Sequence, residues 1–300
     1  MTTTVETPLN ESTTSAALAV PHVHKKPYLT IRARQGWVGI DMRELWRFRE
    51  LLFSLTGRDV KLRYKQTVLG VIWVVLQPLV AAGIFTYVFG RLANMATPLT
   101  SSGKPVPYFL FAFSGMVAWG LFFNSVSKIA GILVGNSSLV SKVYFPRLLL
   151  PLSGATGVLV DLGVAAAMLL VMQLFTGVGL TWQWFLAPVI LVLLLSLALG
   201  IGTWAAALCV EYRDVAYILP VFLQFLLFAS PIGYKVDPAQ SHLFYLNPLA
   251  GLLDAWRWSV LSTPFPPMWA FLYSAALSMV LLFIGAMVFR RMERNFADVI

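Results

Sequence analysis

The chain has 300 residues, of which 58% are hydrophobic and only 12% are charged, and its mean hydropathy is +0.76. A soluble domain carries about 25% charged and about 45–50% apolar residues, so this composition excludes a soluble globular protein. The net charge of +9 does not indicate nucleic acid, because the basic residues flank apolar segments and form no recognition motif. We expect an all-helical, polytopic membrane protein surrounded by membrane lipids.

The first 40 residues are predicted to be a polar, disordered tail. Residues 1–30 are rich in Thr and Ser. Their only apolar run, Ala16–Val20, is shorter than the core of about 7–15 residues that a signal peptide needs. Later segments must therefore drive insertion, and residues 41–300 are predicted to form one transmembrane domain.

An amphipathic helix is predicted over about residues 43–57, before the first span. Apolar side chains recur at helical spacing at Leu45, Phe48, Leu52 and Leu55, and basic residues occupy much of the remaining surface. A basic amphipathic helix lies in the plane of the membrane interface. We expect this helix to do the same.

Six segments are apolar and long enough to cross about 30 Å of hydrocarbon, which takes about 20 helical residues. They are residues 68–89, 108–133, 148–175, 184–210, 215–234 and 268–289. No internal repeat is evident, so an inverted-repeat secondary transporter gains no support. With six spans, 17 basic residues fall on the side of the termini and 4 on the other, which predicts that both termini are cytoplasmic.

The stretch 235–267 is neither an ordinary loop nor a span. Its longest apolar piece, Ala250–Leu261, contains Asp254 and Arg257 and would rise only about 18 Å as a helix. We expect two short re-entrant or interfacial helices here, broken at Asn247-Pro248.

Motifs for enzymatic chemistry are largely absent. The only Gly-Lys pair, Gly103-Lys104, lacks the other residues of a phosphate-binding loop, so ATP hydrolysis by that route is not expected. One cysteine, Cys209, and three histidines give no basis for a disulfide or a metal cluster. Two charges lie within spans: Lys128 can extend to the headgroups, whereas Asp161 is either a buried structural group or part of a transport path.

Aromatic side chains make up 14% of the chain. Many lie at the ends of spans, where interfacial belts are expected, and packing explains most of the others. Some rings within spans are candidates for a path on which sugar rings stack. These candidates are Trp73, Phe85, Trp119, Phe122, Tyr217, Phe222 and Phe225.

Two cytoplasmic turns also stand out. Gly135–Arg147 carries the apolar triplet Val143-Tyr144-Phe145, and exposed apolar side chains of this kind are costly unless a partner covers them. Glu211–Asp214 forms a second turn that is very short and highly charged.

With these segments in view, the chain resembles a known family. Arg58–Gly70, followed by Trp73 and Leu76–Leu79, closely resembles the start of the ABC-2 type permeases that export polysaccharides such as O-antigen, capsule and teichoic acid. Later motifs of that family are matched in the right order by Lys142–Arg147, Tyr212–Asp214, Ala229–Ile232 and Asn247-Pro248. The resemblance covers roughly residues 40–300.

The resemblance implies a homodimeric, six-span permease of the bacterial cytoplasmic membrane, paired with a separate ATPase subunit that holds the ATP and Mg²⁺. This chain itself would hold no cofactor, and its substrate would be a lipid-linked glycan moved to the outer leaflet. In such permeases the interfacial helix and the turn at 136–146 contact the ATPase, and the short helices between spans five and six gate the outer face. The coupling candidates are Arg47, Asn136, Ser138, Lys142, Val143, Tyr144, Phe145, Arg213 and Asp214. The gate candidates are Asn247, Pro248, Asp254 and Arg257.

Other functions remain open at this point. The same scaffold could export a drug or another small amphiphile. A membrane-embedded glycosyl or acyl transferase would need a cluster of acidic or histidine residues near one interface, and the sequence offers none. An ion-coupled carrier would need more intramembrane charge than Asp161.

Overall fold

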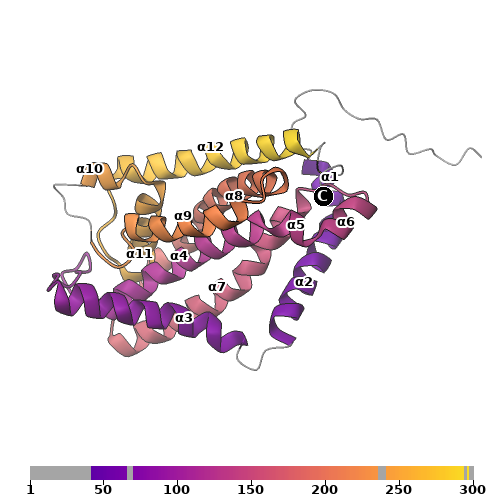
Figure 1. Cartoon of the computed structure of the whole chain (residues 1–300). Coiled ribbons are helices and arrows are strands. Elements are labelled where there is room, and N and C mark those ends of the chain that lie inside the picture. The colour runs from indigo at the N-terminus through magenta and orange to yellow at the C-terminus, as the bar shows by residue number, and fades with distance from the viewer. Residues whose placement is uncertain (1–41, 66–69, 236–240, 294–295, 297–300) are drawn as a thin grey trace, which may run out of the picture. The chain divides into compact units, whose positions relative to one another are not determined.

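The computed structural model describes residues 42–65, 70–235, 241–293 and 296 (Figure 1). The expected tail, residues 1–40, lies outside them. Helices make up most of the described chain, which contains no strand beyond one isolated bridge between Leu99 and Pro105. The expected all-helical class is confirmed.

Five helical segments are long and apolar enough to cross a membrane, and each matches one of the expected spans within a few residues. Their ends follow local signals: Pro107 and Pro267 directly precede two of them, and Gly177 ends another with a left-handed φ of 70°. The five are α3 with its π-helical continuation η1 (Gly70–Phe85 and Thr86–Leu92), α4 (Tyr108–Ala130), α7 (Leu149–Thr176), the 3-10 turn η2 with α8 (Trp182–Leu186 and Ala187–Glu211), and α12 (Met268–Met292).

The sixth expected span, 215–234, is helical only over α9 (Val215–Ala229). Its 15 residues rise about 22 Å, less than the roughly 30 Å of a hydrocarbon core. The chain leaves the helix at Ser230, where the backbone is extended, because a residue that precedes proline disfavours the helical conformation. A six-span topology therefore stays a prediction.

The shorter helices lie before and between the long ones. The region expected to hold one helix over 43–57 contains two, α1 (Met42–Arg47) and α2 (Arg49–Lys65). The turn between α4 and α7 contains α5 (Ile132–Gly135) and α6 (Ser137–Lys142). The stretch 235–267 contains α10 (Ser241–Phe244) and α11 (Pro248–Leu261), so the break falls at Asn247-Pro248 as expected. A re-entrant position for these two helices stays a prediction.

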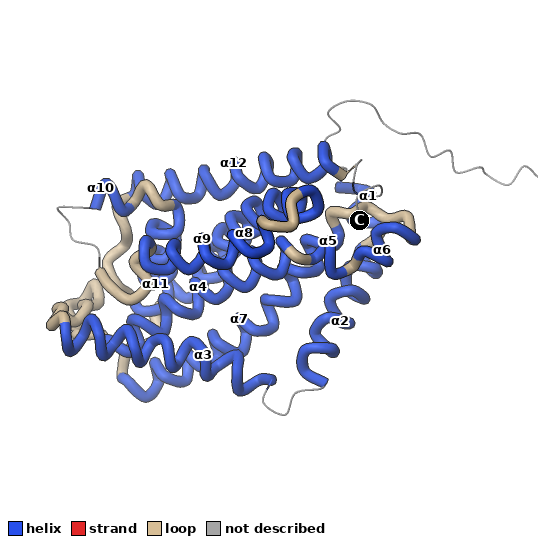
Figure 2. The backbone as a smooth tube through the Cα atoms, in the orientation of Figure 1, coloured by secondary structure: helices blue, strands red, loops and turns tan. Residues whose placement is uncertain are grey.

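The long helices pack side by side in the order α12, α8, α4, α7, and α2 then packs against α7. α4 lies at the centre and is the most buried of the long helices, whereas α3 with η1 has few buried residues. Most loops lie at two ends of these helices, which we call the α6 end and the α11 end (Figure 2).

α8 and α12 cross closely. A β-carbon at Gly285 would collide with the backbone oxygen of Gly200, and one at Gly200 would collide with the backbone of Leu281. Helices of membrane proteins commonly approach through such small residues. These two glycines therefore bring the two backbones into direct contact.

Candidate functional site

The charged residue in the middle of α7, Asp161, is the anchor point for α2. Asp161 is buried, forms an ion pair with Arg63, and accepts a hydrogen bond from the hydroxyl of Tyr64. Nearer the start of both helices, α2 makes a further contact with α7, in which the hydroxyls of Thr56 and Thr156 lie 2.7 Å apart. Asp161 is thus a buried structural partner in this conformation.

Lys128, near the end of α4, also pairs with α2. Its amino group lies 3.6 Å from a carboxylate oxygen of Asp59. A β-carbon at Gly157 of α7 would collide with that amino group, so the glycine makes room for it. We expected Lys128 to extend to the headgroups; it bonds to the neighbouring helix instead.

Burial affects the titration of Tyr64. Burial first, and then the hydrogen bond to Asp161, raise the pKa of the Tyr64 hydroxyl from 10.0 to about 12. The neutral phenol is therefore favoured in the folded protein, as its role as donor to a carboxylate requires.

The apolar stripe of the expected interfacial helix packs against protein. Leu55 is buried, and Leu45, Phe48 and Leu52 pack against the same cluster. That cluster contains residues from α4, α5, α6, α7, α8, α12 and the turn before α7, among them Val140, Phe145, Leu149 and Phe289. The helix is therefore held to the bundle by its apolar face as well as by its charges.

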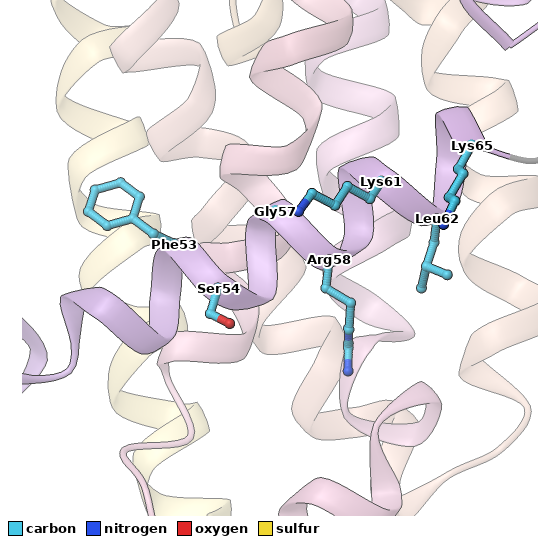
Figure 3. Close-up of a pocket in the computed structure, with 7 residues that line it drawn as sticks. All are labelled: Phe53, Ser54, Gly57, Arg58, Lys61, Leu62 and Lys65. Carbon is cyan, nitrogen blue, oxygen red and sulfur yellow. The ribbon is translucent and has the colours of Figure 1, made fainter.

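The opposite face of α2 combines basic and apolar side chains. It lines a shallow, open concavity of about 490 Å³ (Figure 3). Its two large apolar residues, Phe53 and Leu62, are exposed. Such a mixture suits a helix at a membrane surface. The lining residues are Phe53, Ser54, Gly57, Arg58, Lys61, Leu62 and Lys65.

The turn between α4 and α7 is tied directly to α2. The guanidinium of Arg58 donates to the side-chain oxygen of Asn136 at 2.7 Å, and the amide of Asn136 donates to the carbonyl of Ile132 at 2.9 Å. Phe145 is buried in the cluster that holds Leu55. Two of the coupling candidates, Asn136 and Phe145, are therefore part of the attachment of α2.

The other coupling candidates are exposed. Val143 and Tyr144 follow α6 with 50% and 66% of their surface accessible, so the apolar patch expected on this turn exists. The remaining ones are also exposed, on α1, on α6 and in the turn between α8 and α9: Arg47, Ser138, Lys142, Arg213 and Asp214. Val215, directly after that last turn, packs with Ala130 at the end of α4, so the turn also lies at the α6 end.

The gate candidates gather at the α11 end. Asn247 caps α11 by accepting a hydrogen bond from the Leu249 amide at 3.0 Å, and Pro248 takes the first helical position. Arg257 is buried and lies 3.3 Å from a carboxylate oxygen of Asp254. The other oxygen of Asp254 accepts from the Tyr245 hydroxyl at 2.9 Å.

The seven candidate rings for a path differ in burial. Trp119 and Phe122 are buried in the main core and pack on each other, so in this conformation they are packing residues. Phe85 is half-buried and stacks on Phe89. The other four are exposed on α3 and α9, and they remain candidates: Trp73, Tyr217, Phe222 and Phe225.

Sequence reasoning missed the partners on α2. Asp59, Arg63 and Tyr64 were read as part of a family motif, and nothing assigned them to Asp161 or Lys128. A usable signal was present, because two isolated intramembrane charges need partners of opposite charge, and the charged segment 58–65 immediately precedes a span.

The described residues thus form apolar helices of membrane length, with a charged helix bonded to them near the α6 end. No three His, Cys, Asp or Glu side chains of the described residues gather as a metal site would require. This is a multi-pass membrane protein. Residues 50–261 match the family described as "ABC-2 type transporter", so the chain belongs to that family of transport permeases.

Similar proteins of known name are permeases and transport proteins. The chain is 28% identical over 262 residues to the "O-antigen export system permease protein RfbA" of Myxococcus xanthus, covering 86% of this chain and 98% of that protein. It is 25% identical to a protein of the same name in Klebsiella pneumoniae, covering 84% and 95%. It is 24% identical to the "Polysialic acid transport protein KpsM" of Escherichia coli, covering 80% and 92%.

Proposed function

We propose that this chain is the transmembrane subunit of an ABC exporter that moves a lipid-linked polysaccharide across the bacterial cytoplasmic membrane. Its family and the names of its relatives support export of a polysaccharide. The observation that carries the proposal is structural: the turn that carries the exposed residues 143–144 is hydrogen-bonded through Asn136 to α2, and α2 is bonded to the middle of α7. That arrangement suits the transfer of movement from a partner into the membrane helices.

The partner in this proposal is a separate ATPase subunit that binds ATP and Mg²⁺. Val143 and Tyr144 would lie in its contact surface, flanked by the exposed polar candidates Ser138 and Lys142. Arg58 and Asn136 would then transmit its movement to α2, because they join the turn to that helix. The charged pair Arg213 and Asp214 would add a second contact at the same end.

A homodimer is the proposed assembly. α3 and α9 carry rows of exposed apolar side chains, and α9 has only Leu223 buried. Surfaces of this kind face either lipid or a second copy of the chain. A second copy would also cover part of α9 with protein, and α9 is too short to cross the membrane alone.

The proposed orientation places the α6 end, the ATPase and both termini in the cytoplasm. Single cysteines at Lys104 and Ser138 test this, with Cys209 replaced by Ala. An impermeant thiol reagent applied from outside intact spheroplasts should label a cysteine at Lys104 and leave one at Ser138 unlabelled. The reverse pattern would contradict the orientation.

Deletion of the gene for this chain tests the substrate class. Cells without it should accumulate lipid-linked glycan that stays inaccessible to an impermeant glycan-binding probe, and the intact chain with its ATPase should restore surface display. Unchanged surface glycans would contradict the proposal. Such a result together with a newly acquired sensitivity to a lipophilic compound would favour the alternative, an exporter of small amphiphiles.

A further inference from the structure

The chain directly after α9 is buried without being helical. Ser230 and Ile232 are fully buried, and Pro231 and Gly233 are also buried. Buried carbonyl groups outside a helix need hydrogen-bond partners, and irregular backbone at membrane depth is tolerated only where protein groups supply them. The segment 230–233 is therefore stable only if other elements satisfy it.

Arg257 of α11 supplies two of the bonds. One terminal nitrogen of its guanidinium donates to the carbonyl of Pro231 at 2.6 Å, and the other donates to the carbonyl of Ile232. The planar fork of arginine reaches two adjacent acceptors at once, which the single ammonium of lysine does not do. Arg257 itself is only 1% exposed.

Two further side chains bind the carbonyls on either side. The hydroxyl of Tyr108, at the start of α4, donates to the carbonyl of Gly233 at 2.7 Å. The amide of Asn247 donates to the carbonyl of Ala229 at 3.3 Å and to the hydroxyl of Ser230 at 2.9 Å. Side chains from α4, from the cap of α11 and from α11 itself thus hold the end of α9.

The surroundings of Arg257 are shaped to fit it. Its guanidinium lies 3.9 Å from the centre of the Phe111 ring, and Asp254 is a nearby counter-ion. A β-carbon at Gly115 would collide with both the Ile232 carbonyl and the guanidinium. The adjacent Trp256 fixes α11 to α4 by donating to the carbonyl of Ser114 at 2.9 Å.

We propose that Arg257 is a positioning residue for export, which fixes the end of α9 to α4 and α11, whereas the rest of α9 makes few contacts within this chain. This inference rests on the proposed function. The contrast within α9 supports it: the segment after the helix is buried and bonded at every carbonyl from 229 to 233, whereas Leu223 alone is buried within the helix. We call this set of bonds the α9 anchor.

Arg257→Lys distinguishes the effect of the two carbonyl hydrogen bonds from the effect of the positive charge. It keeps the positive charge near Asp254 but loses the two-carbonyl bond. Arg91→Lys is the matched control, because Arg91 is exposed on η1 and takes no part in the anchor. Tyr108→Phe is a milder second variant that keeps the ring and removes the bond to Gly233, together with a long contact of the hydroxyl with the sulfur of Met95.

A distance measurement tests the anchor without any substrate. Spin labels at Phe228→Cys and Leu272→Cys, both exposed positions on α9 and α12, are attached to the full chain with Cys209→Ala, in complex with its ATPase. The distance distribution between the labels should broaden strongly in Arg257→Lys, less in Tyr108→Phe, and not in Arg91→Lys.

Export and ATP hydrolysis are measured on the same complexes. Arg257→Lys should assemble with the ATPase and hydrolyse ATP, while export per ATP falls about tenfold, the order expected when a charged donor loses a hydrogen bond. Unchanged distances and export in Arg257→Lys would overturn the proposal. The proposal would also be overturned if Arg257→Lys and Tyr108→Phe lost assembly with the ATPase in proportion to their loss of export. Arg257 would then have only a structural role. If the unchanged complex exports no glycan, the proposed function fails, and the distance measurement still decides whether the anchor exists.

Discussion

Arg63 of α2 and Asp161 of α7 lie 98 positions apart in the sequence and form an ion pair in the folded chain. Asp161 is buried whereas the side chain of Arg63 is about half exposed, so the pair links the buried middle of α7 to the partly exposed helix α2. With Tyr64 on the same carboxylate and Asp59 on Lys128, it makes α2 part of the helical body.

A double-mutant cycle measures the strength of this pair. Arg63→Met and Asp161→Asn should each lower the free energy of unfolding in mixed micelles, and their coupling energy should be about 1–2 kcal/mol. Lys61→Met is the control, because Lys61 lies on the opposite face of α2. Its effect should add to that of Asp161→Asn within about 0.5 kcal/mol. Additivity of the Arg63 and Asp161 variants would mean that the pair contributes nothing.

The raised pKa of Tyr64 predicts a pH dependence. The folded protein favours the neutral phenol, so its contribution to stability is complete below pH 10.0 and is lost as the pH rises through about 12. The thermal midpoint of the unchanged chain should therefore fall more steeply between pH 10 and 12 than that of Tyr64→Phe. Parallel curves for the two proteins would show that Tyr64 titrates normally.

The exposed turn after α6 predicts a loss of assembly on charge insertion. Val143→Asp would bury an unpaired carboxylate in the proposed contact, at a cost of several kcal/mol. Leu99→Asp is a matched control, because Leu99 has 49% of its surface exposed against 50% for Val143 and lies in the loop between η1 and α4. Co-purification with the ATPase should fail for Val143→Asp and persist for Leu99→Asp. Equal recovery of the two complexes would exclude this turn as the docking element.

The candidate rings should separate into two groups on truncation. Phe122→Ala and Trp119→Ala remove buried rings, so they should destabilise the chain by about 3–5 kcal/mol and lower its yield. Phe222→Ala and Phe225→Ala remove exposed rings, so they should leave yield unchanged and slow export if these rings line the path. Normal export by both α9 variants at normal yield would remove these two rings from the path.

The sequence predicted the long helices well because a single local property defines them. An apolar run of sufficient length forms a helix in a membrane whatever surrounds it, and Pro107, Gly177 and Pro267 mark helix ends locally. The break at Asn247-Pro248 was predictable for the same reason, since Asn is a favourable cap and Pro a favourable first residue.

The end of α9 is marked by its own sequence, because Ser230 precedes Pro231, but the burial of the backbone after it was not predictable. The apolar run continues to Tyr234, but the helix stops at Ala229, and Arg257, Tyr108 and Asn247 bind the backbone that follows. Likewise the role of Asp161 depended on a partner 98 positions earlier. Both misses concern contacts between distant segments, which composition and periodicity do not encode.

The backbone contact of Gly200 with Gly285 closes the crossing of α8 and α12. Where two helices touch main chain to main chain, neither an acyl tail nor a sugar ring fits between them, and prying them apart would expose carbonyl groups to hydrocarbon. α8 and α12 therefore leave no opening between them at this crossing, and a passage between these two helices is excluded there.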